Sequence, residues 1–230
     1  MHKDERERII LKIAGAAIAA FLVFCVSFAI TFIDRGIYDR NFGKNGAYEK
    51  IGPGVRDTTD SLISYLSKDA DEADSAPGLY IFTKAERDHL EDVHAIFKRF
   101  KYAAIISSAA LLIIIMRMRA NGVLSQGWQP MLKLAGIIAA SALALLFVLS
   151  LNFDWFFTNF HYIFFPQGNW QFPADSLLIT MFPADFFRSF VLKMFFHALV
   201  GSLILYFIGT SKNFTAQKAD DAHARAGKRR

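Results

Sequence analysis

The sequence lacks the features that hold small secreted domains or common hydrolase sites together. It has one cysteine, Cys25, in 230 residues, and a single cysteine cannot form an intrachain disulfide. It contains no G-x-S-x-G motif, no H-E-x-x-H motif and no paired cysteine and histidine spacing. A disulfide-stapled domain is therefore excluded, and both an elbow-type serine hydrolase and a common type of zinc site are disfavoured.

Charged residues are also nearly absent from four long apolar runs, in which the hydrophobic residues (53% of the chain) are concentrated. A transmembrane helix needs about 20 mainly apolar residues. The runs therefore predict spans at residues 9–33, 102–119, 131–151 and 190–211. The first run is longer than the apolar core of a signal peptide, so we expect it to stay attached as a span.

Basic residues, which give a formal net charge of +5, flank the apolar runs and are not interleaved with aromatic residues. This pattern argues against a nucleic-acid partner. Lys and Arg beside a span favour the cytoplasm. Segments 1–8 and 120–130 and the basic tail 212–230 are therefore predicted to be cytoplasmic. Residues 34–101 and 152–189 are predicted to lie outside, where cytosolic ATP is not available.

The first outer segment, 34–101, is too small for a thick core of its own. Leu79 to Phe82 is predicted to be a short strand. Thr83 followed by Glu86 forms a capping box, which predicts a helix from about Lys84. The fold class is thus an α-helical membrane protein with four transmembrane helices and a small extracytoplasmic cap of mixed α/β structure.

The course of the helix after Thr83 is open. Leu90, Val93, Phe97 and Phe100 recur at helical spacing, which favours a helix that lies on the bilayer and bends before Tyr102. The alternative is a helix that continues unbroken into the second span.

The second outer segment, 152–189, is unusually rich in aromatic residues, placed around His161, Asn169 and Asp175. An interfacial aromatic belt would explain Trp and Tyr at the membrane surface. It does not explain polar side chains among so many Phe, because a buried polar group needs a partner. We therefore predict a wet pocket roofed by aromatic side chains: Trp155, Phe157, Phe160, Phe164, Phe165 and Phe186.

Two outer histidines, His89 and His161, are candidates for acid and base catalysis, because imidazole titrates near neutral pH. The alternative is a metal site in which Glu86 and Asp92 join the two histidines as ligands. The spacing of these four residues matches no common metal motif.

Two motifs carry a resemblance to a known family. The first is Glu86-x-x-His89-Leu90-x-Asp92-Val93, and the second is Phe160-His161-Tyr162-x-Phe164-Phe165, followed by Asn169-Trp170, Asp175 and Pro183-x-x-Phe186-Phe187. In this order, framed by four spans, they resemble the bacterial lipoprotein intramolecular transacylase family. The resemblance covers nearly the whole chain.

The resemblance implies a multi-pass protein of the bacterial cytoplasmic (inner) membrane that acts on diacylglyceryl-modified lipoproteins among membrane lipids. It would move the sn-2 acyl chain of the diacylglyceryl-cysteine to the α-amine of that cysteine, and the product would be the N-acyl, S-monoacylglyceryl (lyso) form. Direct transfer needs no cofactor. His89 and His161 would share the acid and base roles.

The resemblance also suggests supporting roles around the two histidines. Asp92 would orient His89, while Tyr162, Asn169 and Trp170 are candidate donors to the oxyanion. Glu86 and Asp175 belong to the same motifs. Two other functions stay open: a metal-dependent membrane lipid hydrolase, and a non-catalytic membrane assembly or sensor protein.

Overall fold

The computed structural model describes residues 3–68 and 78–211, and the secondary structure of this part is α-helical. The basic tail 212–230 lies outside the described residues. The nine helices of the described part are α1 (Lys3–Ile33), α2 (Arg35–Asn45), α3 (Ala47–Ile51), α4 (Val55–Ser67), α5 (Lys84–Ala120), α6 (Leu124–Ser150), α7 (Phe153–Phe164), α8 (Leu177–Met181) and α9 (Ala184–Thr210).

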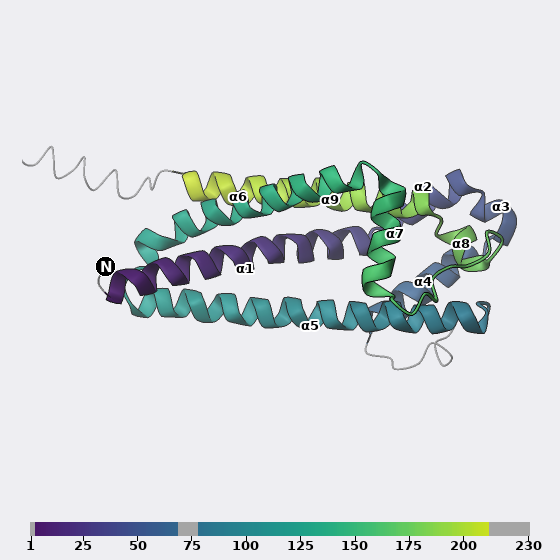
Figure 1. Cartoon of the computed structure of the whole chain (residues 1–230), viewed down its shortest axis with the longest axis horizontal. Helices are drawn as coiled ribbons and strands as arrows, with labels where there is room; N and C mark the ends of the chain where they lie inside the picture. The colour runs from purple at the N-terminus through teal and green to yellow at the C-terminus, as the bar shows by residue number, and fades with distance from the viewer. Residues whose placement is uncertain (1–2, 69–77, 212–230) are drawn as a thin grey trace, which may run out of the picture.

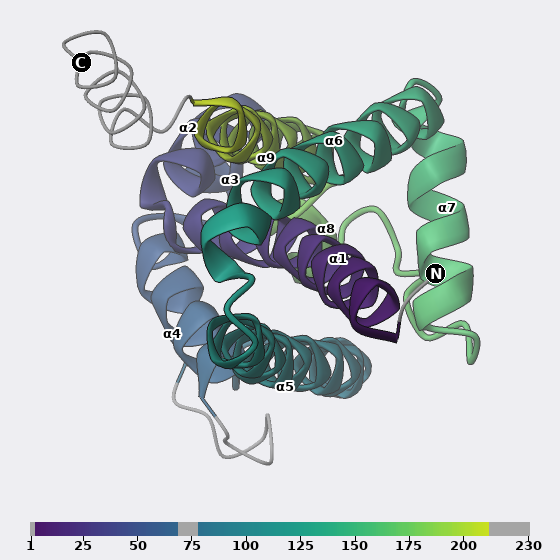
Figure 2. The same ribbon diagram turned by 90° about the vertical axis from the view of Figure 1, so that its left-hand side faces the viewer.

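Four long helices, α1, α5, α6 and α9, form the bundle, and each is long and apolar enough to cross a membrane. They run side by side along the molecule, and the short helices gather at one end (Figure 1). Viewed along the bundle, α1 lies between α5 on one side and α6 and α9 on the other (Figure 2). This arrangement establishes an integral membrane protein with a helical cap at one end.

Helices α6 and α9 approach each other closely at glycines. A Cβ atom on Gly136 would lie 2.6 Å from the backbone oxygen of Ser202 and 2.7 Å from the backbone nitrogen of Tyr206. Only a residue without a side chain fits there, as is usual where membrane helices touch.

Two polar residues of the last predicted span, Lys193 and His197, have partners on α1 or directly after it. Lys193 forms an ion pair with Asp34, whose other carboxylate oxygen caps α2. The Thr31 hydroxyl donates to the Ser27 carbonyl at 2.8 Å, so it accepts from Nδ1 of His197 at 2.9 Å. These contacts join α1 and α9 and satisfy groups that would be costly in a bilayer.

The helix from Lys84 is continuous with the second predicted span, so the predicted bend before Tyr102 is wrong. Helix α5 extends over 37 residues and contains no proline or glycine that would break it. Its apolar face packs on protein rather than lipid: Leu90 is buried in the cap core, and Phe97 contacts Phe28 of α1 at 5.2 Å between ring centroids. The beginning of the helix is as predicted, since Thr83 and Glu86 form the capping box.

The strand predicted for Leu79 to Phe82 is also wrong, and with it the mixed α/β character of the cap. The segment is a turn closed by a 3.1 Å bond from the Phe82 N–H to the Leu79 carbonyl. Leu79 and Phe82 are fully buried, while Tyr80 and Ile81 are exposed. Burial thus recurs every three residues, whereas a strand with one buried face requires a period of two.

The glycine contact gives a test of the bundle. We expect Gly136→Ala to reduce the free energy of unfolding by about 1–3 kcal/mol, because the new methyl group forces α6 and α9 apart. The control is Gly43→Ala, since a Cβ at this exposed position in α2 meets no atom within 4 Å. Thermal unfolding of both variants in detergent measures the effect. Equal melting temperatures would contradict the close approach.

Candidate active site

Two histidines from distant parts of the sequence stack at the capped end of the bundle. His89 lies on α5, before the predicted span 102–119, and His161 lies on α7, which crosses the bundle (Figure 1). Their ring centroids are 6.4 Å apart and the ring planes are inclined by 22°. The two residues are only 7% and 8% exposed. The capping of α7 by Asn152 and the continuity of α5 bring them together.

The backbone fixes the tautomer of His161. Its Nδ1 lies 2.7 Å from the carbonyl oxygen of Phe157, and because a carbonyl only accepts, Nδ1 carries the proton. Nε2 therefore has the lone pair in the neutral ring. Burial lowers the pKa of His161, and the bond to Phe157 partly offsets this effect.

The neutral form is favoured more strongly in His89 than in His161. Burial lowers the pKa of His89 to about 4, and repulsion from a charge on His161 contributes. Asp92 and the side-chain amide of Asn169 act in the opposite direction. Because the pKa of each ring lies below its ordinary value, both rings are mainly neutral at neutral pH.

Asp92 connects α5 to the loop that follows α7. Its Oδ2 accepts from Nε2 of Gln167 at 2.9 Å and from Nδ2 of Asn169 at 2.5 Å. The carboxylate thus positions the loop beside His89. Gln167 was not predicted from the sequence, because an exposed loop glutamine belongs to no motif.

Three buried polar atoms at this site have no hydrogen-bond partner among the described residues: Nδ1 of His89, Oδ1 of Asn169 and Nε1 of Trp170. The Asn169 amide therefore acts on the His89 pKa as a nearby dipole, without the geometry of a formed bond. An unsatisfied buried group costs about 1–3 kcal/mol. Three such atoms in one place indicate a site arranged for a polar ligand.

The predicted aromatic residues divide into two groups. Phe157, Phe160, Phe165 and Trp170 contact the His161 ring, with centroid distances from 4.1 Å for Phe157 to 5.6 Å for Phe160. Phe165 also contacts His89, as does Phe172, another aromatic residue of the same outer segment. The remaining predicted aromatics do not contact the histidine rings. Phe164 packs on Phe160, and Tyr162 packs on Trp170. Trp155 is half exposed, and Phe186 is buried in the cap core.

Glu86 and Asp175 lie outside the immediate site. Glu86 is 1% exposed, and its carboxylate accepts from the Thr83 N–H and from the Leu178 N–H, both at 2.8 Å. It therefore joins α5 to the beginning of α8. Asp175 is exposed and makes no hydrogen bond or ion pair within the described part of the chain. No group of three or more His, Cys, Asp or Glu in that part is arranged to hold a metal ion.

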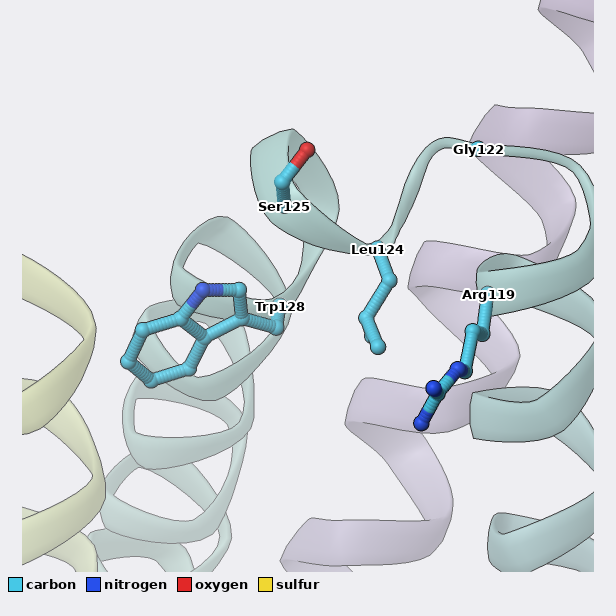
Figure 3. Close-up of a pocket in the computed structure, with 5 residues that line it drawn as sticks. All are labelled: Arg119, Gly122, Leu124, Ser125 and Trp128. Atoms are coloured by element: carbon cyan, nitrogen blue, oxygen red, sulfur yellow. The ribbon is translucent and has the colours of Figure 1, made fainter. Parts of the chain in front are cut away.

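Two surface recesses lie away from the histidines. One, of about 410 Å³, is at the opposite end of the bundle, where Arg119, Leu124 and Trp128 surround it together with Gly122 and Ser125 (Figure 3). The other, of about 330 Å³, is an apolar groove between α6 and α9.

Comparison with known proteins adds the family. Residues 13–187 match the sequence model of the family described as lipoprotein intramolecular transacylase Lit. The chain belongs to this family. The resemblance inferred from the two histidine motifs is thereby confirmed, and with it a transacylase that modifies lipoproteins in a membrane.

Solved structures of the membrane integral transacylase Lit from Bacillus cereus have the same fold. One is 20% identical, with a TM-score of 0.75, and the match covers 88% of this chain and 94% of that one. Another, which carries a histidine-to-arginine substitution, is 19% identical with a TM-score of 0.76 over 95% and 96% of the two chains. No curated protein sequence matches the chain significantly.

The low pKa of His89 predicts a pH dependence of stability. Because the ordinary value is 6.5 and the folded value is about 4, the unfolded chain binds more protons between these pH values. The free energy of unfolding should therefore rise as pH increases from 4 to 6.5, with roughly 2–4 kcal/mol from this residue. His89→Gln should show a flatter rise when melting is compared at pH 5 and pH 7.5. An unchanged slope would mean that His89 is not buried in its neutral form.

Proposed function

We propose that this protein moves the sn-2 acyl chain of a diacylglyceryl-cysteine to the α-amine of the same cysteine, giving the lyso-form lipoprotein. The observation that carries the proposal is the buried pair of neutral histidines, with unpartnered polar atoms on His89 itself and on Asn169 and Trp170. Family membership supports the substrate class.

The reaction is ester aminolysis and needs one proton to be moved. The amine nitrogen attacks the ester carbonyl, a C–N bond forms, and the C–O bond to the glyceryl oxygen breaks. The amine loses the proton that the glyceryl oxygen gains. A pair of neutral rings, one of which has a free lone pair to accept the proton, suits this transfer.

His161 is assigned as the base. Its Nδ1–H is engaged by the Phe157 carbonyl, so Nε2 is the atom able to accept the amine proton. The same proton then moves to the glyceryl oxygen as the C–O bond breaks. We place His89 at the leaving oxygen, where it relays this proton to the glyceryl group, and Asp92 offsets part of the cost of a charge on its ring.

Trp170 is assigned as the main donor to the oxyanion. Its buried Nε1–H has no partner among the described residues, and its ring lies 4.6 Å from that of His161. A donor that gains a partner only when the tetrahedral intermediate forms lowers the barrier selectively. Holding amine and ester in one pocket contributes further, because intramolecular reactions reach high effective molarities.

The orientation of the bundle in the membrane is inferred from the basic segments beside the spans. We place the histidine end of the bundle on the extracytoplasmic side of the bacterial cytoplasmic membrane, with both chain ends in the cytoplasm. Helix α7 then lies in the interface, because Trp155, Tyr162 and Ile163 are 51–72% exposed. The diacylglyceryl group would thus reach the histidines from the bilayer surface.

The central test uses a reporter lipoprotein in a host that cannot N-acylate lipoproteins. Co-expression with the wild type should convert its N-terminal peptide from the diacylglyceryl form to the isobaric lyso form, which mass-spectrometric fragments with an N-linked acyl group identify. His89→Ala and His161→Ala should abolish the conversion. The matched control is His94→Ala, since His94 is a buried histidine of the same helix that bonds to the Lys68 carbonyl.

The other two functions predict different results in the same system. A metal-dependent hydrolase would release free fatty acid, and its activity would be lost on adding EDTA. An assembly or sensor protein would leave the reporter unchanged while the folded protein is present in the membrane. Either result would overturn the proposal.

The oxyanion role of Trp170 is tested by removing only its N–H. Trp170→Phe should lower kcat by about 10²–10³, with little change in KM, because the donor acts in the transition state. Trp155→Phe is the matched control, since Trp155 is half exposed and contacts neither histidine ring. If Trp170→Phe kept full activity, the oxyanion would be bound elsewhere.

A further inference from the structure

An apolar groove runs between α6 and α9 in the half of the bundle nearer the histidines. It holds about 330 Å³ and is lined on each helix by residues at positions i, i+3, i+4 and i+7. Small side chains on α6 leave room for the groove, and large side chains on α9 form its other wall. The main lining residues are Ala140, Ala144 and Phe147 of α6 and Leu192, Phe196 and Leu199 of α9.

The groove faces outward from two helices that cross the membrane. Leu192 and Phe196 are 50% and 62% exposed, and no polar side chain lines the space. In a bilayer, an outward apolar groove is filled by hydrocarbon. The lining residues extend over about two turns of each helix, so the groove can hold part of one acyl chain.

A charged group lies at the mouth of the groove. Arg188 precedes Leu192 by four residues, so it lies on the same face of α9 one turn nearer the capped end. Its guanidinium lies 5.2 Å from the centre of the Phe153 ring at the beginning of α7. It forms ion pairs with Asp154 and Asp185 at N–O distances of 3.8 Å and 3.6 Å, both longer than a hydrogen bond.

The mouth therefore offers guanidinium donors that make no hydrogen bond in the described part of the chain and form only long ion pairs with two exposed carboxylates. A phosphate matches the guanidinium and a primary ammonium matches the carboxylates. The diacylglyceryl group of a lipoprotein carries no phosphate. A glycerophospholipid with an amine headgroup has both charges and also supplies the acyl chain.

We propose that this groove binds a phosphatidylethanolamine-type lipid, with its phosphate at Arg188, its ammonium at Asp154 and Asp185, and one acyl chain between α6 and α9. The lipid joins α6, α9 and the first turn of α7. Because α7 carries His161, lipid binding stabilises the helix that holds the site. The inference does not rest on the transacylase chemistry.

The test is lipid binding by the full chain, delipidated in detergent and titrated with palmitoyl-oleoyl phosphatidylethanolamine, with the bound lipid counted by native mass spectrometry. Arg188→Gln and Ala144→Phe should each weaken binding at least fivefold, and Ala140→Leu is a second, milder variant that fills the groove. Arg119→Gln, an exposed arginine beside the other recess, should leave binding unchanged.

Further variants and competitors distinguish phosphatidylethanolamine from ligands that share only its headgroup or its acyl chains. Asp154→Asn with Asp185→Asn should remove the preference for phosphatidylethanolamine over phosphatidylglycerol. Unchanged binding in both Arg188→Gln and Ala144→Phe would overturn the proposal. So would equal competition by glycerophosphoethanolamine, which has no acyl chains, or full displacement by a diacylglyceryl-cysteinyl peptide, which would assign the groove to the substrate.

Discussion

Helix α5 runs without a break from Lys84 to Ala120, and the position of the site depends on this continuity. The helix enters the cap as a rigid rod, because Glu86 fixes its first turn to Thr83 and to the N–H of Leu178. His89 and Asp92 follow one and two turns later. The cap thus assembles around a transmembrane helix rather than forming a separate domain.

The site combines a rigid part with a part held by a few polar contacts. His89 is fixed on α5, whereas the loop after α7 is held by the bonds from Gln167 and Asn169 to Asp92. The same carboxylate also favours charge on His89, so loop position and histidine charge are coupled. A substrate that pairs with the unpartnered atoms of Asn169 and Trp170 would satisfy two buried polar groups.

Features that depend on residues close together in the sequence were predicted correctly. The Thr83 and Glu86 box fixed the beginning of α5, and the apolar runs predicted the four long helices. The predicted bend and the predicted strand are wrong because packing against distant residues determines both structures. The face of α5 with Leu90 and Phe97 packs on protein, and Leu79 and Phe82 are buried three residues apart. Gln167 was missed because nothing in its own sequence distinguishes it from other loop residues.

The most direct measurement of the central claim is a crossover experiment with two synthetic diacylglyceryl-cysteinyl peptides. One has a light peptide with an isotopically heavy sn-2 acyl chain, and the other has a heavy peptide with a light chain. Incubated together with the purified protein, each peptide should keep its own label, now as an N-linked acyl group, in the mass spectrum. Exchange of labels between peptides, or transfer of the sn-1 chain, would contradict intramolecular transfer from the sn-2 ester.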